Sequence, residues 1–319
     1  MRPFFENNVL QQQPFKPMII VVDTTKAGSA SNTFVLPIIK AASETVKIYW
    51  GDGTNSIGVN GNNTHVYAAS GVYTVKIESK IFGGVYFITA GDKEKLLSIR
   101  TFGRGIIRSL YHAFSGCSNL AIINDPTLIN TSELCIYAFF GCSSLTALPL
   151  IDLSRATNTS YMCYQCTSLS SVPLINLSNV TNTSYMFYQC TSLSSVSLIN
   201  LSNVTNTSYM FYQCTSLSSV SLINLSNVTN TNYMFYQCSA LTNIPLLNLS
   251  SVTNAAGMFL GCTLTTKSYS DFLINLATLP LQSGVSFHGG YSKYNVAGGV
   301  ARAYLISNFG WTIADGGAA

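Results

Sequence analysis

Residues 169–240 repeat one 24-residue unit three times: LSSVPLINLSNVTNTSYMFYQCTS (169–192), LSSVSLINLSNVTNTSYMFYQCTS (193–216) and LSSVSLINLSNVTNTNYMFYQCSA (217–240). The first two copies differ only where Pro173 in one corresponds to Ser197 in the other. A fixed period of this length is typical of a solenoid, in which each unit covers its apolar face with its neighbours. Such a chain makes a long regular surface rather than a pocket. The repeat pattern therefore favours a role in display, spacing or adhesion over a role in catalysis.

The period continues outside the exact copies. Cysteines recur in one register at Cys117, Cys142, Cys166, Cys190, Cys214, Cys238 and Cys262. In the central unit, the spacing of Leu193, Val196 and Leu198 predicts a short strand with side chains entering a core. Residues 207–214 are long enough for one or two helical turns, with Thr207 or Ser208 as the N-cap. We expect one coil per unit, stacked at about 4.8 Å.

The repeat also carries a resemblance. Its pattern N-V-T-N-x-S-Y-M-F-Y-x-C-x-S-L-x-S-V resembles the BspA-like leucine-rich repeats of bacterial, protist and phage-encoded surface proteins, over residues 109–264. The resemblance implies a leucine-rich-repeat solenoid of short strands and short helices. Leu201 occupies the usual asparagine-ladder position and Asn200 lies one place earlier, so we do not expect that buried ladder.

Residues 18–108 predict β-structure, with strands near 18–22, 34–38, 46–50 and 73–77. The stretches WGDGT (50–54) and HVYAASGVYTVKI (65–77) resemble the signature of the PKD-like β-sandwich, which has an immunoglobulin-like fold. Asp52 and His65 are the tempting pair for a metal or a reaction. Asp and Gly suit the tight turn itself, so we predict structural roles for both residues.

The two ends of the chain depart from the period. Residues 265–319 predict a C-terminal α/β cap, with helices at 271–279 and 300–309 and strands at 285–287 and 311–313. The string from SKYN to GWTIADGG resembles the closing unit that follows such repeats in phage and marine bacterial proteins. Residues 1–17 predict an N-terminal arm that docks on a partner. The expected fold is thus β-rich and mixed: arm, sandwich, solenoid and cap.

The composition of the chain argues against several classes of function. Residues 156–264 contain no Asp, Glu, Lys, Arg or His, so the solenoid offers no group for acid–base chemistry and no cations for nucleic acid. The basic stretch at 91–108 predicts a solvated capping face, with an anionic partner as the alternative. The nine cysteines predict buried structural thiols, and the lone pair at Cys163 and Cys166 lacks further zinc ligands. We expect no enzyme activity, no cofactor and no metal.

The sequence predicts neither a membrane-spanning segment nor a secretory signal peptide. No segment approaches 18 consecutive apolar residues, which argues against membrane insertion. The first 17 residues carry Glu6 and a glutamine run where a signal peptide needs an apolar core. This pattern favours a protein assembled in a host cytoplasm over an exported adhesin.

Two tyrosine rows provide the candidate interaction surface. The members are Tyr161, Tyr185, Tyr209 and Tyr233 in one row and Tyr164, Tyr188, Tyr212 and Tyr236 in the other. Tyrosine can stack on sugars or pack on protein; we expect at least one row to pack only against the next coil. The leading hypothesis is a virion-associated adhesion or decoration protein of a tailed phage, contacting other virion proteins or a host-surface glycan or protein. A bacterial cell-surface adhesin and a purely structural capsid or tail decoration protein are the alternatives, and homo-oligomerisation stays open.

Overall fold

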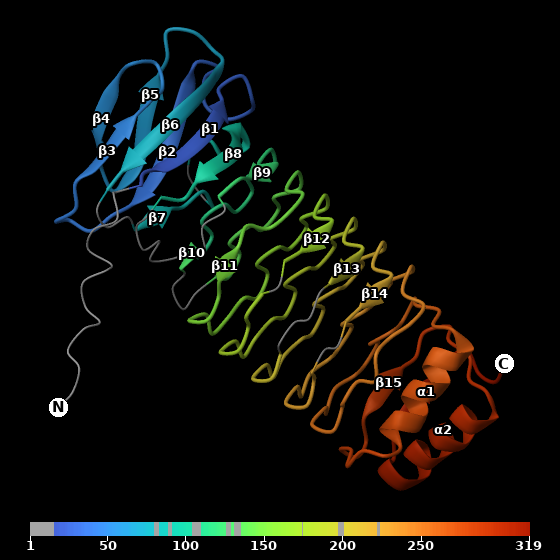
Figure 1. Cartoon of the computed structure of the whole chain (residues 1–319). Helices are drawn as coiled ribbons and strands as arrows, with labels where there is room; N and C mark the ends of the chain where they lie inside the picture. Colours follow the sequence, from blue (N-terminus) through green and yellow to red (C-terminus); the bar gives the residue numbers. More distant parts are fainter. Residues whose placement is uncertain are drawn as a thin grey trace, which may run out of the picture.

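A computed structural model describes residues 16–79, 83–88, 91–103, 110–125, 129–130, 135–173, 175–196, 201–221 and 224–319. The protein is β-rich, and the described part contains several small sheets and two α-helices. Figure 1 shows three regions in a row: a unit of strands at the N-terminal end, a run of narrow coils, and a pair of helices at the C-terminal end. Most of the predicted arm, together with Arg104, Arg108, Leu198 and Asn200, lies outside the described residues.

Two sheets form the N-terminal unit. The larger has the order β4-β3-β6-β1-β8-β9 and the smaller the order β5-β2-β7. The strands of the larger sheet are β1 (Met18–Asp23), β3 (Val46–Tyr49), β4 (Asn55–Gly58), β6 (Val72–Glu78), β8 (Leu96–Thr101) and β9 (Ile122–Ile123). Those of the smaller sheet are β2 (Thr33–Ile39), β5 (Gly61–Val66) and β7 (Gly84–Val85). Alternating side chains such as Ile20, Ile48 and Leu36 are buried, so both sheets contribute to the core.

The tight turn at residues 50–54, which we call the Trp50 turn, joins the two sheets. Tyr67, which follows β5, donates its hydroxyl to Trp50 O at 2.9 Å. His65 of β5 stacks on the Trp50 ring, with centroids 4.8 Å apart, and its Nε2 lies 2.8 Å from Asp52 Oδ2. Burial opposes ionisation of Asp52, but hydrogen bonds from Thr54 and His65 outweigh it and lower the pKa of Asp52 to about 2. These contacts give the Asp52–His65 pair a structural role.

Lys95 is a buried cation in the N-terminal unit. It ends the short 3-10 helix η1 (Lys93–Lys95), and its Nζ donates to the carbonyl oxygens of Ser29, Ala30 and Thr33 at 2.9 Å each. Asp92 Oδ2 lies 3.5 Å away. The expectation of a solvated basic face is therefore wrong for Lys95, because these partners fix the ammonium inside the unit.

The N-terminal unit and the coils share one sheet. β9, which belongs to the first coil, pairs in parallel with β8, with Ser98 opposite Ile122 and Ile99 opposite Ile123. Asn119 Nδ2 donates to Glu94 O at 2.7 Å. β8 thus acts as the first rung and covers the end of the stack, which a terminal repeat must do for solubility.

Residues 24 apart in the sequence lie side by side in successive coils. β12 (Ser171–Val172), β13 (Ser195–Val196) and β14 (Ser219–Val220) form a parallel sheet. Ala147 continues this register one coil earlier through an isolated bridge to Ser171. At a later point of the coils, β10 (Ile129–Asn130) pairs in parallel with β11 (Ile151–Asp152), with partners 22 residues apart. On another side of the coils, isolated parallel bridges connect Asn158, Asn182, Asn206, Asn230 and Asn254. The strand predicted from the spacing of Leu193 and Val196 is present, but it is only two residues long.

The helical turns expected at residues 207–214 are not formed, and that prediction is wrong. Tyr209 and Gln213 have φ values of 58° and 55°, in the left-handed region that ends a right-handed helix. Backbone N–H groups alternate between their own coil and the next. Met210 N donates within its coil to Thr207 O at 3.1 Å, and the following N–H crosses to the next coil. The segment is therefore a chain of tight turns that bonds to its neighbour at every second residue.

The first of these turns is closed by an asparagine. Asn206 Oδ1 accepts from Ser208 N at 3.0 Å, which forms an Asx turn. Thr207 is fully buried and donates its hydroxyl to Asn230 O of the next coil at 3.3 Å. The N-cap predicted at Thr207 or Ser208 is accordingly replaced by the side chain of Asn206.

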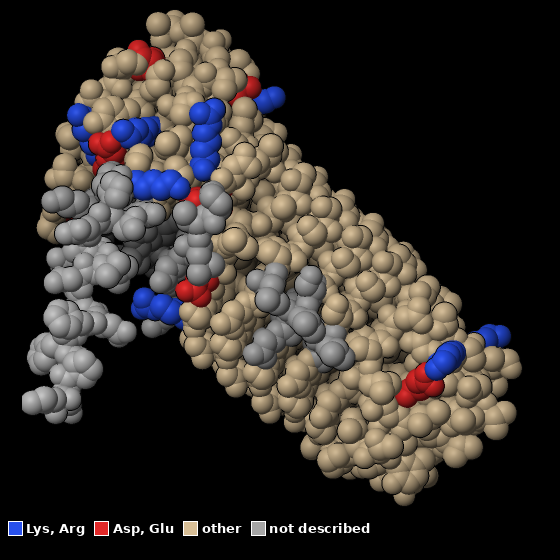
Figure 2. All heavy atoms as spheres, in the orientation of Figure 1, with Lys and Arg blue, Asp and Glu red and all other residues tan. Residues whose placement is uncertain are grey.

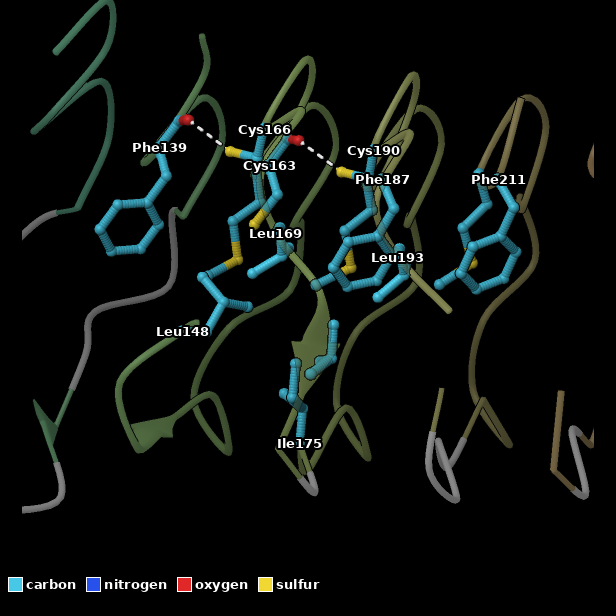
Figure 3. Packing of buried hydrophobic residues seen from close by; sticks show 14 of the residues in the cluster. Phe139, Leu148, Cys163, Cys166, Leu169, Ile175, Phe187, Cys190, Leu193 and Phe211 are labelled. Atoms are coloured by element: carbon cyan, nitrogen blue, oxygen red, sulfur yellow. Dashed lines mark hydrogen bonds between the residues drawn. The ribbon is translucent and has the colours of Figure 1, made fainter. Parts of the chain in front are cut away.

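Rows of apolar side chains, with one residue from each coil, fill the stack (Figure 3). Phe211 stacks on Phe187 and Phe235 with centroids 5.7 and 5.5 Å apart. All nine cysteines are buried and free. Thiols of the repeating register also donate: Cys190 Sγ lies 3.2 Å from Cys163 O of the previous coil, as the dashed line in Figure 3 shows. The cysteine register therefore combines packing with an inter-coil hydrogen bond.

At the C-terminal end, the coils continue but carry helices. α1 (Thr266–Leu276) and α2 (Val296–Phe309) alternate with β15 (Ser286–His288) and β16 (Thr312–Ala314). β15 bonds to the preceding coil through the bridge from Ala255 to Phe287, and β16 pairs in parallel with β15. The predicted helices at 271–279 and 300–309 are present, but both begin earlier. Thr265 and Asn295 cap them by accepting from the N–H groups of Ser268 and Gly298.

Candidate functional site

The first tyrosine row (Tyr161, Tyr185, Tyr209 and Tyr233) is a continuous stack of rings. Successive ring centroids lie 4.5, 4.6 and 5.2 Å apart. All four residues have positive φ, between 52° and 58°. His112 and Tyr137 extend the row toward the N-terminal unit, with their rings stacked at 4.4 Å. At the other end stands Gly257, where an added Cβ would lie 2.3 Å from the Tyr233 ring.

The second tyrosine row (Tyr164, Tyr188, Tyr212 and Tyr236) is more regular still. Its ring centroids lie 4.4, 4.6 and 4.4 Å apart, and its ring planes differ by 3°, 3° and 8°. Phe140 continues it toward the N-terminal unit. The small angles mean that successive coils are nearly parallel, so this face of the stack has little twist.

Both rows pack ring on ring, and all eight tyrosines are half-buried. Each ring covers the flat faces of its neighbours, so the rows present ring edges and hydroxyls to solvent. Ring-on-ring packing against the next coil is present in both rows. A ligand therefore meets hydroxyl edges here, while ring-face stacking on a sugar is blocked within each row.

Burial and neighbouring phenol groups raise the pKa of one tyrosine in the middle of each row. Burial, followed by the neighbouring Tyr161 and Tyr209, raises the pKa of Tyr185 to about 12. Burial, followed by Tyr164 and Tyr212, raises the pKa of Tyr188 to about 12. The surface offers hydroxyl groups rather than charges at neutral pH.

Sequence reasoning missed a third row beside the tyrosines. In this glutamine row, each side-chain amide donates to the next: Gln165 to Gln189 at 2.8 Å, Gln189 to Gln213 at 2.6 Å and Gln213 to Gln237 at 2.6 Å. Each member has positive φ, like the tyrosine four residues before it. The 24-residue recurrence of glutamine was the available signal. These amides link successive coils beside the tyrosine rows.

Exposed threonines make a further row on the coils. Thr205 Oγ1 donates to Thr181 O at 3.2 Å, and Thr229 Oγ1 donates to Thr205 O at 3.1 Å. These hydroxyls satisfy backbone carbonyls of the previous coil. The threonine row therefore stabilises the stack and provides a matched control for mutations in the tyrosine rows.

The histidines and cysteines form no shared centre. The described residues contain no group of three or more His, Cys, Asp and Glu that could hold a metal ion. Cys163 and Cys166 are both buried in the core, and burial raises the pKa of the Cys163 thiol well above its usual value. His112 lies in the first tyrosine row, while His288 Nδ1 accepts from Gly290 N at 3.0 Å.

One groove, which the sequence did not predict, opens where the turn-built coils meet the first helix. We call it the α1 groove. Residues 243–246 form one wall, and Lys267, Asp271, Ile274 and Asn275 of α1 form the other. Its volume is about 660 Å³, within the range of about 300–1,000 Å³ that small-ligand sites occupy.

Two known families match parts of the coil region. Residues 101–207 match the family described as a BspA type leucine rich repeat region. Over that stretch, the coils are similar to BspA-type leucine-rich repeats. Residues 157–272 match a family described as a Mycoplasma protein of unknown function, DUF285. The match to BspA-type repeats thus runs from the β8–β9 junction into the exact copies.

Two further comparisons gave no relatives: neither a curated protein nor a solved structure matches the chain. Separately, none of the helices in the described parts of the chain is both long and apolar enough to cross a bilayer.

Proposed function

We propose that this BspA-type repeat protein is a non-enzymatic adhesion and display protein. The observation that carries the proposal is a rigid face without charge: residues 156–264 contain no acidic, basic or histidine side chain. The tyrosine and glutamine rows fix that face by stacking and by amide hydrogen bonds. Such a face can bind an uncharged partner along its length without desolvating an ion.

The fold supports a finer interpretation of each part. The two sheets around the Trp50 turn fit a PKD-like, immunoglobulin-type sandwich, and the coils fit a leucine-rich-repeat solenoid. In this proposal, the sandwich and arm attach the protein and the solenoid projects from it. Figure 2 supports that division, because charged side chains gather over the N-terminal unit and most of the visible coil surface lacks them.

The narrower proposal places the protein on the virion of a tailed phage, with other virion proteins and a host-surface glycan or protein as partners. The BspA-type repeats favour a surface protein and fit a bacterial cell-surface adhesin equally well. A purely structural decoration protein is the second candidate, because the inter-coil bonds make a stiff spacer even without a ligand.

The test uses fluorescently labelled full-length protein, incubated with candidate host cells and, in parallel, with phage particles that lack it. Binding to cells supports adhesion, whereas binding to particles alone makes the protein a decoration component. Binding to neither overturns the proposal.

Variants of the rows locate the contact. Tyr212→Ser with Tyr236→Ser changes the second tyrosine row, while Thr205→Val with Thr229→Val changes the threonine row in the same two coils. If the tyrosine face makes the contact, the first double variant weakens cell binding at least tenfold and the second leaves it unchanged. Equal effects of the two pairs would contradict that placement.

A further inference from the structure

The α1 groove exists because two kinds of coil meet there. β14 is the last strand of its parallel sheet, and residues 243–246 of the next coil form no strand. Ile244 N donates to Ser268 Oγ of α1 at 3.1 Å, in place of a carbonyl of a following strand. A helix is wider than an extended segment. Its outer face therefore stands away from the coil and leaves an open space between them.

The groove has polar groups on the helix wall. Lys267 and Asp271 lie one turn apart on α1 and form an ion pair of 2.6 Å. The pair leaves two ammonium donors and the second carboxylate oxygen for a ligand. Asn275 lies one turn further and donates to Leu247 O at 3.0 Å, which fixes its amide and keeps the amide oxygen as an acceptor.

Apolar surface lines the rest of the groove. Leu246 is 60% exposed and Ile274 is 38% exposed, and Pro245 lies beside them. An apolar surface facing a few fixed polar groups is the usual composition of a small-ligand site. The ligand that fits this pattern has hydroxyl groups along one side and C–H groups on the other.

We propose that the α1 groove binds a short neutral oligosaccharide, with its hydroxyls on Lys267, Asp271 and Asn275 and its C–H face on Leu246 and Ile274. The inference rests on the proposed adhesive function and names its ligand class. The ion pair carries no net charge, so the groove offers a ligand hydrogen-bond donors and acceptors rather than a net charge. Hydrogen bonds to the charged groups would be the strong polar contacts of the site.

An extended peptide is the competing occupant, and the coil wall disfavours it. Peptides commonly add to a sheet edge through main-chain hydrogen bonds. Pro245 has no N–H to donate, and Ile244 N is already bonded to Ser268. At residues 244–245, therefore, no backbone N–H group is available to a peptide strand that adds to this edge.

The position of the groove suits a receptor site. It lies beside α1, far along the stack from the N-terminal unit (Figure 1). A site at that end reaches furthest from a particle or cell held by the N-terminal unit.

The test is saturation-transfer NMR on the full-length protein with lactose, maltose, cellobiose and chitobiose, and with sialyllactose and digalacturonate as anionic comparisons. We expect transfer to at least one neutral disaccharide. Asp271→Asn keeps the shape of the side chain and should weaken that binding at least tenfold, as should Leu246→Asn. Lys293→Met removes an exposed lysine outside the groove and should leave binding unchanged.

Two results would overturn the inference: no transfer to any of the four neutral sugars, or binding that survives both groove variants. The labelled-cell assay separates this failure from that of the proposed function. If cells bind the wild type and the Asp271→Asn variant equally, adhesion stands and the groove is not its site. If the wild type binds neither cells nor particles, the adhesive function fails whatever the NMR shows.

Discussion

The N-terminal unit and the coils bury their polar groups in different ways. In the N-terminal unit, single contacts bridge distant parts of the chain, such as Lys95 with the carbonyls of residues 29–33. In the coils, the same few contacts recur every 24 residues between immediate neighbours. One region therefore depends on particular residues, and the other depends on the register between copies.

The strongest single-residue test of the coils is Phe211→Asp. Phe211 is fully buried between two other phenylalanines, so the change removes a stacked ring and buries an unpaired carboxylate. We expect the free energy of unfolding to fall by at least about 4 kcal/mol. Chemical denaturation measures it, with the exposed Thr215→Asp in the same coil as the control. Equal effects of the two variants would show that the phenylalanine row is not a core.

The corresponding test of the N-terminal unit is Lys95→Met. The substitution keeps an apolar stem but leaves Asp92 and three carbonyl oxygens without the ammonium. Removing one partner of a buried ion pair typically costs about 3–5 kcal/mol. Arg100→Met, at an exposed position of β8, is the control. A loss below about 1 kcal/mol would mean that Asp92 is held well enough by its other donors.

The two regions should also differ in their response to pH. Asp52 has its pKa lowered from 3.8 to about 2, so its stabilisation is complete above pH 4 and is lost as the pH falls through 2. Tyr185 has its pKa raised from 10.0 to about 12, so its contribution is complete below pH 10 and is lost as the pH rises through 12. Chemical denaturation at several pH values measures both effects. The Asp52→Asn variant should lose the dependence of stability on pH at the acid end only. If the Asp52→Asn variant still loses stability at low pH as the wild type does, other carboxylates cause that loss.

The smallest expected effect is that of Gln213→Ala. The substitution breaks two links of the glutamine row on a half-exposed face. We expect a loss of about 1 kcal/mol, since each link exchanges with water. Thermal unfolding measures it, with Ser219→Ala on the exposed side of β14 as the control. A loss as large as that of Phe211→Asp would mean that the surface amides, rather than the core, hold the register.

Much of the stack follows from local periodicity. The described positions expected to point inward, among them Leu193, Val196, Met210, Phe211 and Cys214, are all buried. The turns at Tyr209 and Gln213 could not be predicted in this way, because positive φ is uncommon for such residues. Their N–H groups bond to the next coil, and that support is visible only once the coils are stacked.

Features that depend on contacts between distant parts of the chain were harder still to predict from the sequence. The burial of Lys95 requires the loop at residues 29–33, which lies about sixty residues away. The α1 groove arises only where two coil types meet, and the helix predicted at 271–279 did not reach Lys267, which pairs with Asp271. The tyrosine rows, and the packing of at least one of them against the next coil, could be predicted from the 24-residue period.

The most direct test of the coils as interchangeable units compares two deletions. Removing residues 193–216 takes out one whole coil, and near-identical neighbours can close the gap. Removing residues 193–204 takes out half a coil and brings unmatched segments together. Circular dichroism and thermal melting should show a folded, shorter protein for the first deletion and a largely unfolded stack for the second. Equal stability of the two deletions would contradict a structure held by the register between copies.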